Sequence, residues 1–429
     1  MTVDLPSAQP ASVHESFFSH FFLARQPILN RDQQLVAYEL LFRDAHCDGA
    51  DFTDGAAATA AVIAHASELG MEQVVGRQLA YVNVDEVALM SDFIRFLPNH
   101  RVVLEILETV PATPAVLARV RELRLAGFKF ALDDVVAMSQ DVRELAPLVD
   151  VIKIDIHALR DGELAELTRA LAAVGAGGKL LAEKVETLAQ FELCLGMGFA
   201  FFQGYYFARP VILSGKKIAP SELAILELLN LINAEADNAQ IEGRIKHDAL
   251  ISINLLRLVN TPAVGACTRI DTLGQALIVL GRRQLRRWLQ ILLYVQPGTA
   301  QQFASPLLQL AATRGKMLEL MTERLRPGQR TSADIGFTVG IMSLMDAMFS
   351  VRMSDIVAGI KVQDEVRAAL LSREGDFGRM LILVESIERA ASSAELSGEL
   401  DALGLTAADL NAIQIAAFEW VNDYVRGVS

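Results

Sequence analysis

The pattern of hydrophobic and polar positions divides the chain into two parts that meet near residue 210. In the first part, short apolar runs of strand length alternate with longer stretches of helical periodicity. The first two runs are separated only by NRDQQ, which predicts a β-hairpin. The predicted strands are FLARQPIL (22–29), LVAYELLF (35–42), LAYVNV (79–84), VVLEIL (102–107), FKFALDD (128–134), VIKIDI (151–156), KLLAEKV (179–185) and FAFFQGYYF (199–207).

The strands after the hairpin alternate with amphipathic helices, such as PAVLARVRELRLAG (114–127). Alternation of strand and helix is typical of parallel sheets with crossover helices. Eight strands within about 210 residues predict a TIM-like α/β barrel with one antiparallel strand. An open, doubly wound sheet is the alternative that the pattern alone leaves open.

Beyond PVILSGKKIAPSE (210–222) the pattern becomes helical almost throughout, as in SELAILELLNLINAEAD (221–237). We therefore predict a second, all-α domain. The expected divisions are an N-terminal tail (1–19), the barrel (20–211), a linker (212–221) and the helical domain (222–429).

Composition narrows the function classes. The 429 residues include three widely separated cysteines, which fits a reducing cytoplasm better than a disulfide framework. The N-terminus lacks the basic and apolar segments of a signal peptide, and no apolar run approaches the ~18 residues of a membrane span. A net charge of −13 argues against nucleic acid as the main partner.

Nearly every predicted strand carries a polar residue in its middle or near its carboxyl end. Any one of them alone is better explained as an outward-facing position, but a barrel brings the carboxyl ends of its strands together. Carboxylate and amide oxygens are the ligands that Mg²⁺, Mn²⁺ or Ca²⁺ prefer, and a lysine among them indicates a phosphate or an activated water. The sequence thus predicts metal-assisted phosphoester hydrolysis or binding. The residues are Glu39, Asn83, Glu105, Asp133, Asp134, Lys153, Asp155, Glu183 and Gln203.

The order of these motifs resembles the EAL domain, a cyclic di-GMP phosphodiesterase barrel. The resemblance covers roughly residues 20–210 and is specific as an ordered set. It rests on RQPILN with VAYELLFR, YVNVD, VLEILE, LRLAGFKFALDD, VDVIKID and LLAEKVETLAQFELCLGMGFAFFQGYYFARP.

The resemblance implies a role for each matched residue. Lys153, Glu183 and Glu39 would be catalytic, and Gln26 and Arg43 would contact cyclic di-GMP. Glu108 would anchor the loop after Asp134. The implied ligands of Mg²⁺ or Mn²⁺ are Glu39, Asn83, Glu105, Asp133, Asp134, Glu183 and Gln203.

Three departures from the family pattern bear on activity. Leu40 replaces the alanine of the signature, Lys184 replaces a glycine, and DDVVAMSQDVREL lacks the glycines expected after the aspartates. The resemblance with these departures implies cyclic di-GMP binding with weak or no hydrolysis. An active phosphodiesterase giving pGpG and a nucleotide-independent interaction scaffold are the alternatives.

The helical part resembles the HDOD domain, a relative of the HD phosphohydrolases, over residues 247–293 and 337–348. Ser343 and Leu344 stand where an HD enzyme has its His-Asp pair, and His247 is the only histidine after His157. We therefore expect no catalysis there, but a relay to an unknown protein partner, with a homodimer as one assembly. The segment GRRQLRRW (281–288) is either a docking surface for an acidic partner or nucleic acid or, more simply, a solvated helix face or an interdomain salt-bridge surface.

Overall fold

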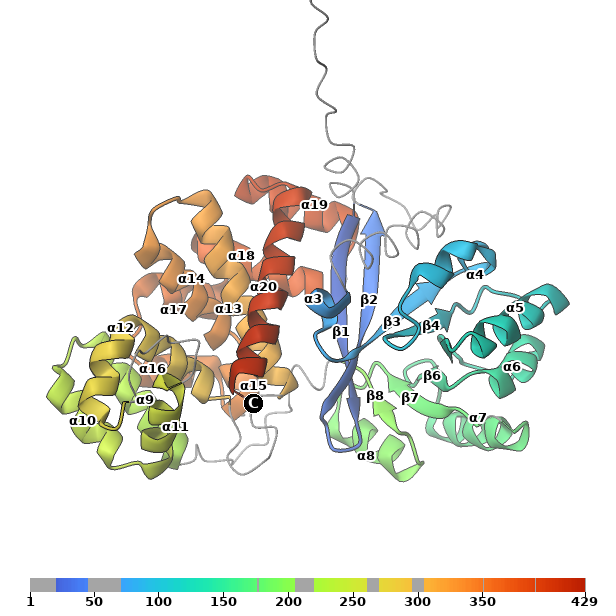
Figure 1. Ribbon diagram of the computed structural model, residues 1–429, viewed down its shortest axis with the longest axis horizontal. Helices are drawn as coiled ribbons and strands as arrows, with labels where there is room; N and C mark the ends of the chain where they lie inside the picture. The colour runs from blue at the N-terminus through green and yellow to red at the C-terminus, as the bar shows by residue number, and fades with distance from the viewer. Residues whose placement is uncertain are drawn as a thin grey trace, which may run out of the picture.

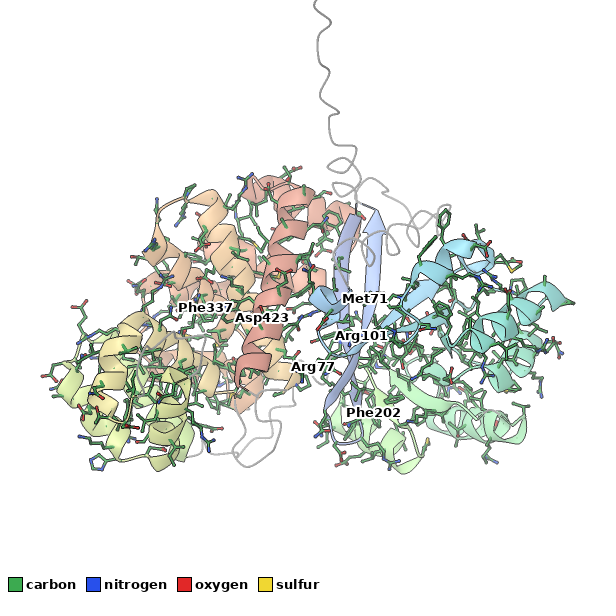
Figure 2. All side chains as sticks on the ribbon, viewed as in Figure 1. Met71, Arg77, Arg101, Phe202, Phe337 and Asp423 are labelled. Atoms are coloured by element: carbon green, nitrogen blue, oxygen red, sulfur yellow. The ribbon has the colours of Figure 1, made fainter. Side chains whose placement is uncertain are left out.

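The computed structural model describes residues 21–44, 71–175, 177–204, 220–260, 270–294, 305–349, 351–389 and 391–428. Figure 1 shows a barrel of strands and helices beside a region built of helices. Figure 2 places Phe202 in the barrel and Phe337 in the helical region, where each side chain is buried in its core.

The strands close into a barrel in chain order, β1 to β8, and β8 pairs with β1. Strand β1 is antiparallel to both of its neighbours, and all other pairs are parallel. This confirms the TIM-like barrel with one antiparallel strand and excludes the open sheet. The strands are β1 (Phe21–Asn30), β2 (Leu35–Asp44), β3 (Leu79–Val84), β4 (Val102–Ile106), β5 (Lys129–Leu132), β6 (Val151–Asp155), β7 (Lys179–Glu183) and β8 (Phe201–Phe202).

The helices around the barrel start at side-chain caps. Thr113 and Ser139 each accept a hydrogen bond from a backbone N–H in the first turn that follows. Thr187 forms a capping box with Gln190. The helices are α3 (Met71–Val75), α4 (Glu86–Met90), α5 (Pro114–Leu125), α6 (Gln140–Leu145), α7 (Asp161–Ala173) and α8 (Leu188–Gly196).

In the described part of the chain after residue 220, every regular element is a helix, as predicted. These helices are α9 (Pro220–Asn233), α10 (Asn238–Lys246), α11 (Ala249–Val259), α12 (Leu273–Leu292), α13 (Pro306–Leu325), α14 (Arg330–Met342), α15 (Met345–Phe349), α16 (Met353–Gly359), α17 (Asp364–Ser372), α18 (Gly375–Glu388), α19 (Ser393–Leu403) and α20 (Ala407–Val428).

One stretch of this region, Arg330–Phe349, is long and apolar enough to cross a membrane by length and composition. In the fold, 67% of its most apolar window is buried. The core helix of a water-soluble protein has the same properties, so this stretch is weak evidence for a membrane span.

Strand β1 joins the barrel to the helical region. Phe22 and Ala24 of β1 belong to the helical core, whereas Phe418 of α20 belongs to the core of the barrel. The Arg25 guanidinium lies 3.7 Å from the centre of the Phe418 ring and 4.4 Å from that of Tyr38. Strand β1 therefore contributes residues to both cores.

Hydrogen bonds continue this junction. The Gln414 amide donates to the Leu23 carbonyl over 2.7 Å, and the Tyr38 hydroxyl donates to Gln309 Oε1 of α13 over 2.6 Å. Figures 1 and 2 show α20 running alongside β1, with Met71 and Asp423 on opposite sides of the junction.

Candidate functional site

Strand alternation explains why polar residues face into the barrel. An apolar layer in the barrel interior contains Ala37, Tyr81, Val103, Ala131, Val151 and Leu181. Because side chains two positions apart lie on the same face of a strand, the next inward positions form a second layer. That layer is Glu39, Asn83, Glu105, Asp133, Lys153 and Glu183. The structure thus brings these predicted residues together at the carboxyl ends of the parallel strands.

The Lys153 ammonium lies at the centre of four carboxylates. Its Nζ is 2.7 Å from Asp133 Oδ1, 2.8 Å from Glu105 Oε1, 3.1 Å from Glu183 Oε1 and 3.3 Å from Glu39 Oε2. The Lys153 side chain is only 1% exposed. We call these four acidic residues the carboxylate cage.

The cage carries more negative charge than one ammonium can compensate. Burial alone would lower the pKa of Lys153, but the surrounding carboxylates raise it well above its usual value. Burial raises the pKa of Glu105 well above its usual value, and Glu39 and Asp133 raise it further against the opposing effect of Lys153. Lys153 is therefore held charged, while the cage favours added protons or a further cation.

Burial also raises the pKa of Glu183 from 4.5 to about 7, which predicts a pH dependence of stability. Between these values the folded protein keeps a proton that the unfolded chain releases. The free energy of unfolding of the metal-free protein should therefore fall as the pH rises through this window. Urea denaturation between about pH 5 and pH 8 measures this decline. Glu183→Gln should flatten it and the exposed-site control Glu166→Gln should not; an unchanged decline in Glu183→Gln would refute the assignment.

Gln203 closes the cage on the side of β1 and β2. Its amide nitrogen donates to Glu39 Oε2 over 2.6 Å and to Gln26 Oε1 over 2.8 Å. Its Oε1 is buried and has no hydrogen-bond partner among the described residues. Gln203 therefore links the predicted nucleotide contact Gln26 to the cage and presents a free acceptor.

The donors of the cage suit a hard divalent cation. They are all oxygen atoms. Both carboxylate oxygens of Glu105 are buried and accept no hydrogen bond; Oε1 forms the ion pair with Lys153. Among the described residues, however, no three carboxylate, imidazole or thiolate groups converge on a point that could hold an ion. The four carboxylates of the cage lie around the Lys153 ammonium instead. A metal ion held by all four of them would compete with this ammonium.

Asp134, Asp155 and Lys184 form a second charged group beside the cage. Asp134 and Lys184 have φ angles of 45° and 56°, in the left-handed region that a lysine adopts only at some cost. Lys184 Nζ lies 2.5 Å from Asp155 Oδ2. Burial raises the pKa of Asp134, and Lys184 opposes that rise. The sequence identified Lys184 only as a missing glycine and did not predict this ion pair.

The loop after Asp134 does not need glycines in this conformation. Within 133–139, positive φ occurs only at Asp134. Val135 is buried in the barrel core, and its N–H donates to the Lys153 carbonyl over 2.9 Å. Neither Val135 nor Val136 has the positive φ that would strain a valine, and Val135 is anchored to β6.

For two predicted residues, Glu108 and Arg43, the structure shows no contact with the cage among the residues that it describes. Glu108 lies on an exposed turn, and its carboxylate makes no hydrogen bond or ion pair among the described residues, so its anchoring role stays a prediction. A different acidic residue contacts the chain four residues after Glu108: Asp141 Oδ1 accepts a hydrogen bond from the Ala112 N–H over 2.7 Å. Arg43 pairs with Phe22 in the β1–β2 ladder, but its side chain lies outside the described residues.

Comparison with known proteins gives relatives that span both parts. The family descriptions "EAL domain" and "HDOD domain" match residues 18–210 and 220–305. The uncharacterized protein YuxH of Bacillus subtilis is 32% identical over 390 residues, which cover 89% of this chain and 94% of YuxH. The cyclic di-GMP phosphodiesterase CdgJ of Vibrio cholerae is 31% identical over 408 residues, which cover 94% of this chain and 93% of CdgJ.

Solved structures resemble the chain more distantly. An EAL domain protein of Listeria monocytogenes has a TM-score of 0.36 and 21% identity, covering 47% of this chain and 94% of its own. The Bacillus subtilis YkuI protein, with an EAL domain and in complex with substrate c-di-GMP and calcium, has a TM-score of 0.36 and 19% identity; the match covers 62% of this chain and 72% of YkuI. By its two domain matches and its near full-length relatives, the chain belongs to the family of proteins that join an EAL domain to an HDOD domain.

Proposed function

We propose that the barrel binds cyclic di-GMP at the carboxylate cage and hydrolyses it weakly or not at all. Binding of the nucleotide then changes the helical region. The observation that carries this proposal is the gathering of four carboxylates around Lys153, with Gln203 and Gln26 hydrogen-bonded at the rim. The name of the relative CdgJ, a cyclic di-GMP phosphodiesterase, supports the choice of nucleotide.

The cage also supports a metal-dependent site for Mg²⁺ or Mn²⁺. When bound, a divalent ion would polarise a phosphodiester and lower the pKa of a water. Lys153, once displaced from the centre, would keep its proton and lie against a phosphate oxygen or the water, with Gln26 positioning the nucleotide. The residues that would hold the ion are Glu39, Asn83, Glu105, Asp133, Asp134, Glu183 and Gln203.

Two features favour slow turnover. Lys153 must leave four carboxylates before an ion can enter, and its ion pairs are buried, so that step is costly. In addition, Lys184 is paired with Asp155 beside Asp134, which places a cation next to a predicted metal ligand. A site assembled in this way binds its ligand more readily than it turns it over.

An active phosphodiesterase that produces pGpG is the second candidate. The complete set of inward-facing acids favours it, as does the unstrained path of the loop after Asp134. The two candidates share the same site and differ only in the rate of the chemical step.

One experiment separates these candidates. Cyclic di-GMP binding is measured by calorimetry with Ca²⁺, and conversion to linear pGpG is followed with Mg²⁺ or Mn²⁺, for the wild type, Glu105→Gln and the exposed-site control Glu166→Gln. We expect binding that Glu105→Gln abolishes and Glu166→Gln preserves, with little pGpG. Rapid turnover lost in Glu105→Gln would establish the phosphodiesterase instead. Absence of binding would leave a nucleotide-independent scaffold.

We propose that β1 is the relay. Gln26 faces the cage, whereas its neighbour Arg25 faces the helical region, where it stacks on Phe418 and approaches Thr313 Oγ1 at 3.4 Å. Adding cyclic di-GMP with Ca²⁺ should therefore change amide hydrogen exchange in α13 and α20 but not in the distant helix α10. Exchange that stays unchanged in α13 and α20 would contradict the relay. Under this proposal the protein acts in the cytoplasm, forms a homodimer and binds a protein partner through its helical region.

A further inference from the structure

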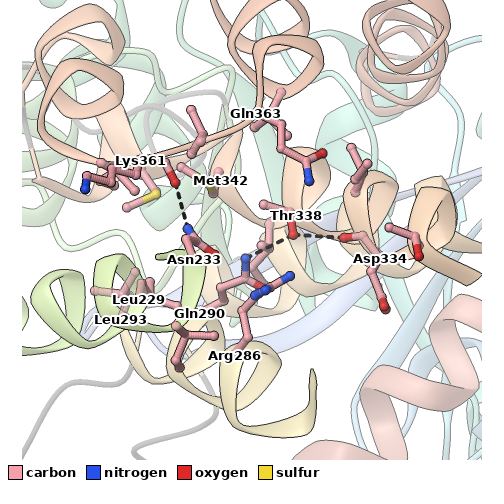
Figure 3. A pocket seen from close by; sticks show the side chains of 18 of the residues that line it. Leu229, Asn233, Arg286, Gln290, Leu293, Asp334, Thr338, Met342, Lys361 and Gln363 are labelled. Atoms are coloured by element: carbon pink, nitrogen blue, oxygen red, sulfur yellow. Dashed lines mark hydrogen bonds between the residues drawn. The ribbon is translucent and has the colours of Figure 1, made fainter. Parts of the chain in front are cut away.

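The helical region encloses a cavity of about 350 Å³, well separated in sequence from the carboxylate cage. Figure 3 shows it between α9, α12, α14 and the segment around residues 360–366. Its wall is about half apolar and half polar, and the polar side includes exposed residues such as Lys361 and Gln363. The apolar lining residues are Leu229, Ile232, Leu293, Ile335, Ile341, Met342, Met345, Ile360, Val362 and Val366.

One face of α12 brings polar groups into this cavity. Arg286, Gln290 and Leu293 are spaced by four and three residues, so they lie on the same side of the helix. Gln290 Nε2 donates to Thr338 Oγ1 over 3.1 Å, and Thr338 in turn donates to the Asp334 carbonyl over 2.8 Å. Figure 3 shows the Arg286 side chain beside this hydrogen-bonded pair.

The arginines of segment 281–288 differ sharply in their partners. Arg283 pairs with Asp334 at 2.7 Å, and Arg287 pairs with Glu319 at 2.5 Å. Both partners lie in the helical region itself, so this helix face is salt-bridged within its own region and these two contacts do not link it to the barrel. Among the described residues, Arg286 makes no ion pair or hydrogen bond, and its Nε is buried without a partner. Two carboxylates line the cavity, Glu235 and Asp334, and Asp334 is already engaged by Arg283.

The Arg286 side chain is half-buried, and its buried Nε has lost its hydration without gaining a hydrogen-bond partner, which is unfavourable for a group that stays charged. A carboxylate or phosphate group in the cavity would restore both the charge balance and the hydrogen bonds through the fork of N–H donors. The apolar wall would bury a hydrocarbon portion of the same ligand.

We infer that this cavity is a binding site for a small organic anion, with its single anionic group on Arg286 and its apolar body against α9, α14 and Ile360. The described lining contains no histidine or cysteine, and the inference concerns binding without any chemical step. It is independent of the proposed function of the barrel.

The test uses the full-length protein and three probes of equal chain length: octanoate, octyl phosphate and the neutral octanol. Calorimetry should show binding of octanoate or octyl phosphate to the wild type, and the preferred one identifies the head group as carboxylate or phosphate. Arg286→Met should weaken that binding about tenfold or more, since a charge-assisted hydrogen bond is lost. The matched control Arg282→Met changes an exposed arginine of the same helix that does not line the cavity, and should bind as the wild type does.

The melting temperature of each variant separates a loss of binding from a loss of folding. Without probe, Arg286→Met should melt at the same temperature as the wild type or higher, because it removes a half-buried charge whose Nε has no partner. A lower melting temperature would show that Arg286 serves packing and would contradict the inference. So would octanol binding as tightly as the anions, equal anion binding by Arg286→Met, or no anion binding at millimolar concentration.

Discussion

Replacing Lys153 by methionine is expected to lower the free energy of unfolding of the metal-free protein by about 3–5 kcal/mol, the usual cost of removing one partner from a buried ion pair. The substitution keeps the volume of the side chain but leaves Glu39, Glu105, Asp133 and Glu183 facing each other without a cation. Urea denaturation in the presence of a chelator, at about pH 8 where Glu183 is deprotonated, measures the loss.

The same variant provides a test of where a metal ion would lie. If an ion takes the position of the ammonium, Mg²⁺ or Mn²⁺ should restore more stability to Lys153→Met than to the wild type. The exposed-site control Lys129→Met should change stability by no more than about 0.5 kcal/mol. A Lys153→Met protein as stable as the wild type without metal would show that the cage does not depend on this charge.

Replacing Gly204 by alanine is expected to cost about 3 kcal/mol or more of stability and to abolish nucleotide binding. A Cβ at this position would lie 2.3 Å from the Val185 nitrogen and 2.4 Å from the Val185 oxygen, and the φ angle of 149° disfavours any side chain. The collision is with backbone, so the ends of β7 and β8 must separate. Gln203 immediately precedes Gly204 and Glu183 lies two residues before Val185, so both would move with them.

Gly198→Ala is the matched control for this collision. Gly198 also has a positive φ, 91°, but no atom lies within 4 Å of its added Cβ. Its expected loss is the backbone penalty alone, about 1 kcal/mol, with nucleotide binding retained. Thermal denaturation and calorimetry of both variants make the comparison, and equal losses in the two would show that the approach of β7 to β8 is not required for the site.

The strand order and the inward-facing acids could be predicted because both follow from local rules. Positions two apart along a strand share a face, so an apolar residue such as Val103 with Glu105 two positions later already defines two layers of the barrel interior. The end of the last strand was predicted less well. The segment 199–207 was expected to be extended, but among its described residues only Phe201–Phe202 form β8.

Features that depend on contacts between distant segments were not predictable. The sequence indicated that Lys153 would lie among carboxylates, but not that its ammonium would take the central point, which depends on four strands at once. Arg286 could not be distinguished from its neighbours Arg283 and Arg287, because their partners lie on α13 and α14. The absence of strain in the loop after Asp134 depends on the Val135 hydrogen bond to β6.

The most direct measurement of the site is Mn²⁺ binding, followed by electron paramagnetic resonance, with cyclic di-GMP present. The wild type and Glu166→Gln should bind Mn²⁺ stoichiometrically, and Glu105→Gln, which removes a buried oxygen donor beside Lys153, should lose this binding. Equal Mn²⁺ binding by the wild type and Glu105→Gln, or no binding by either, would contradict the assignment of the carboxylate cage as a metal-dependent nucleotide site.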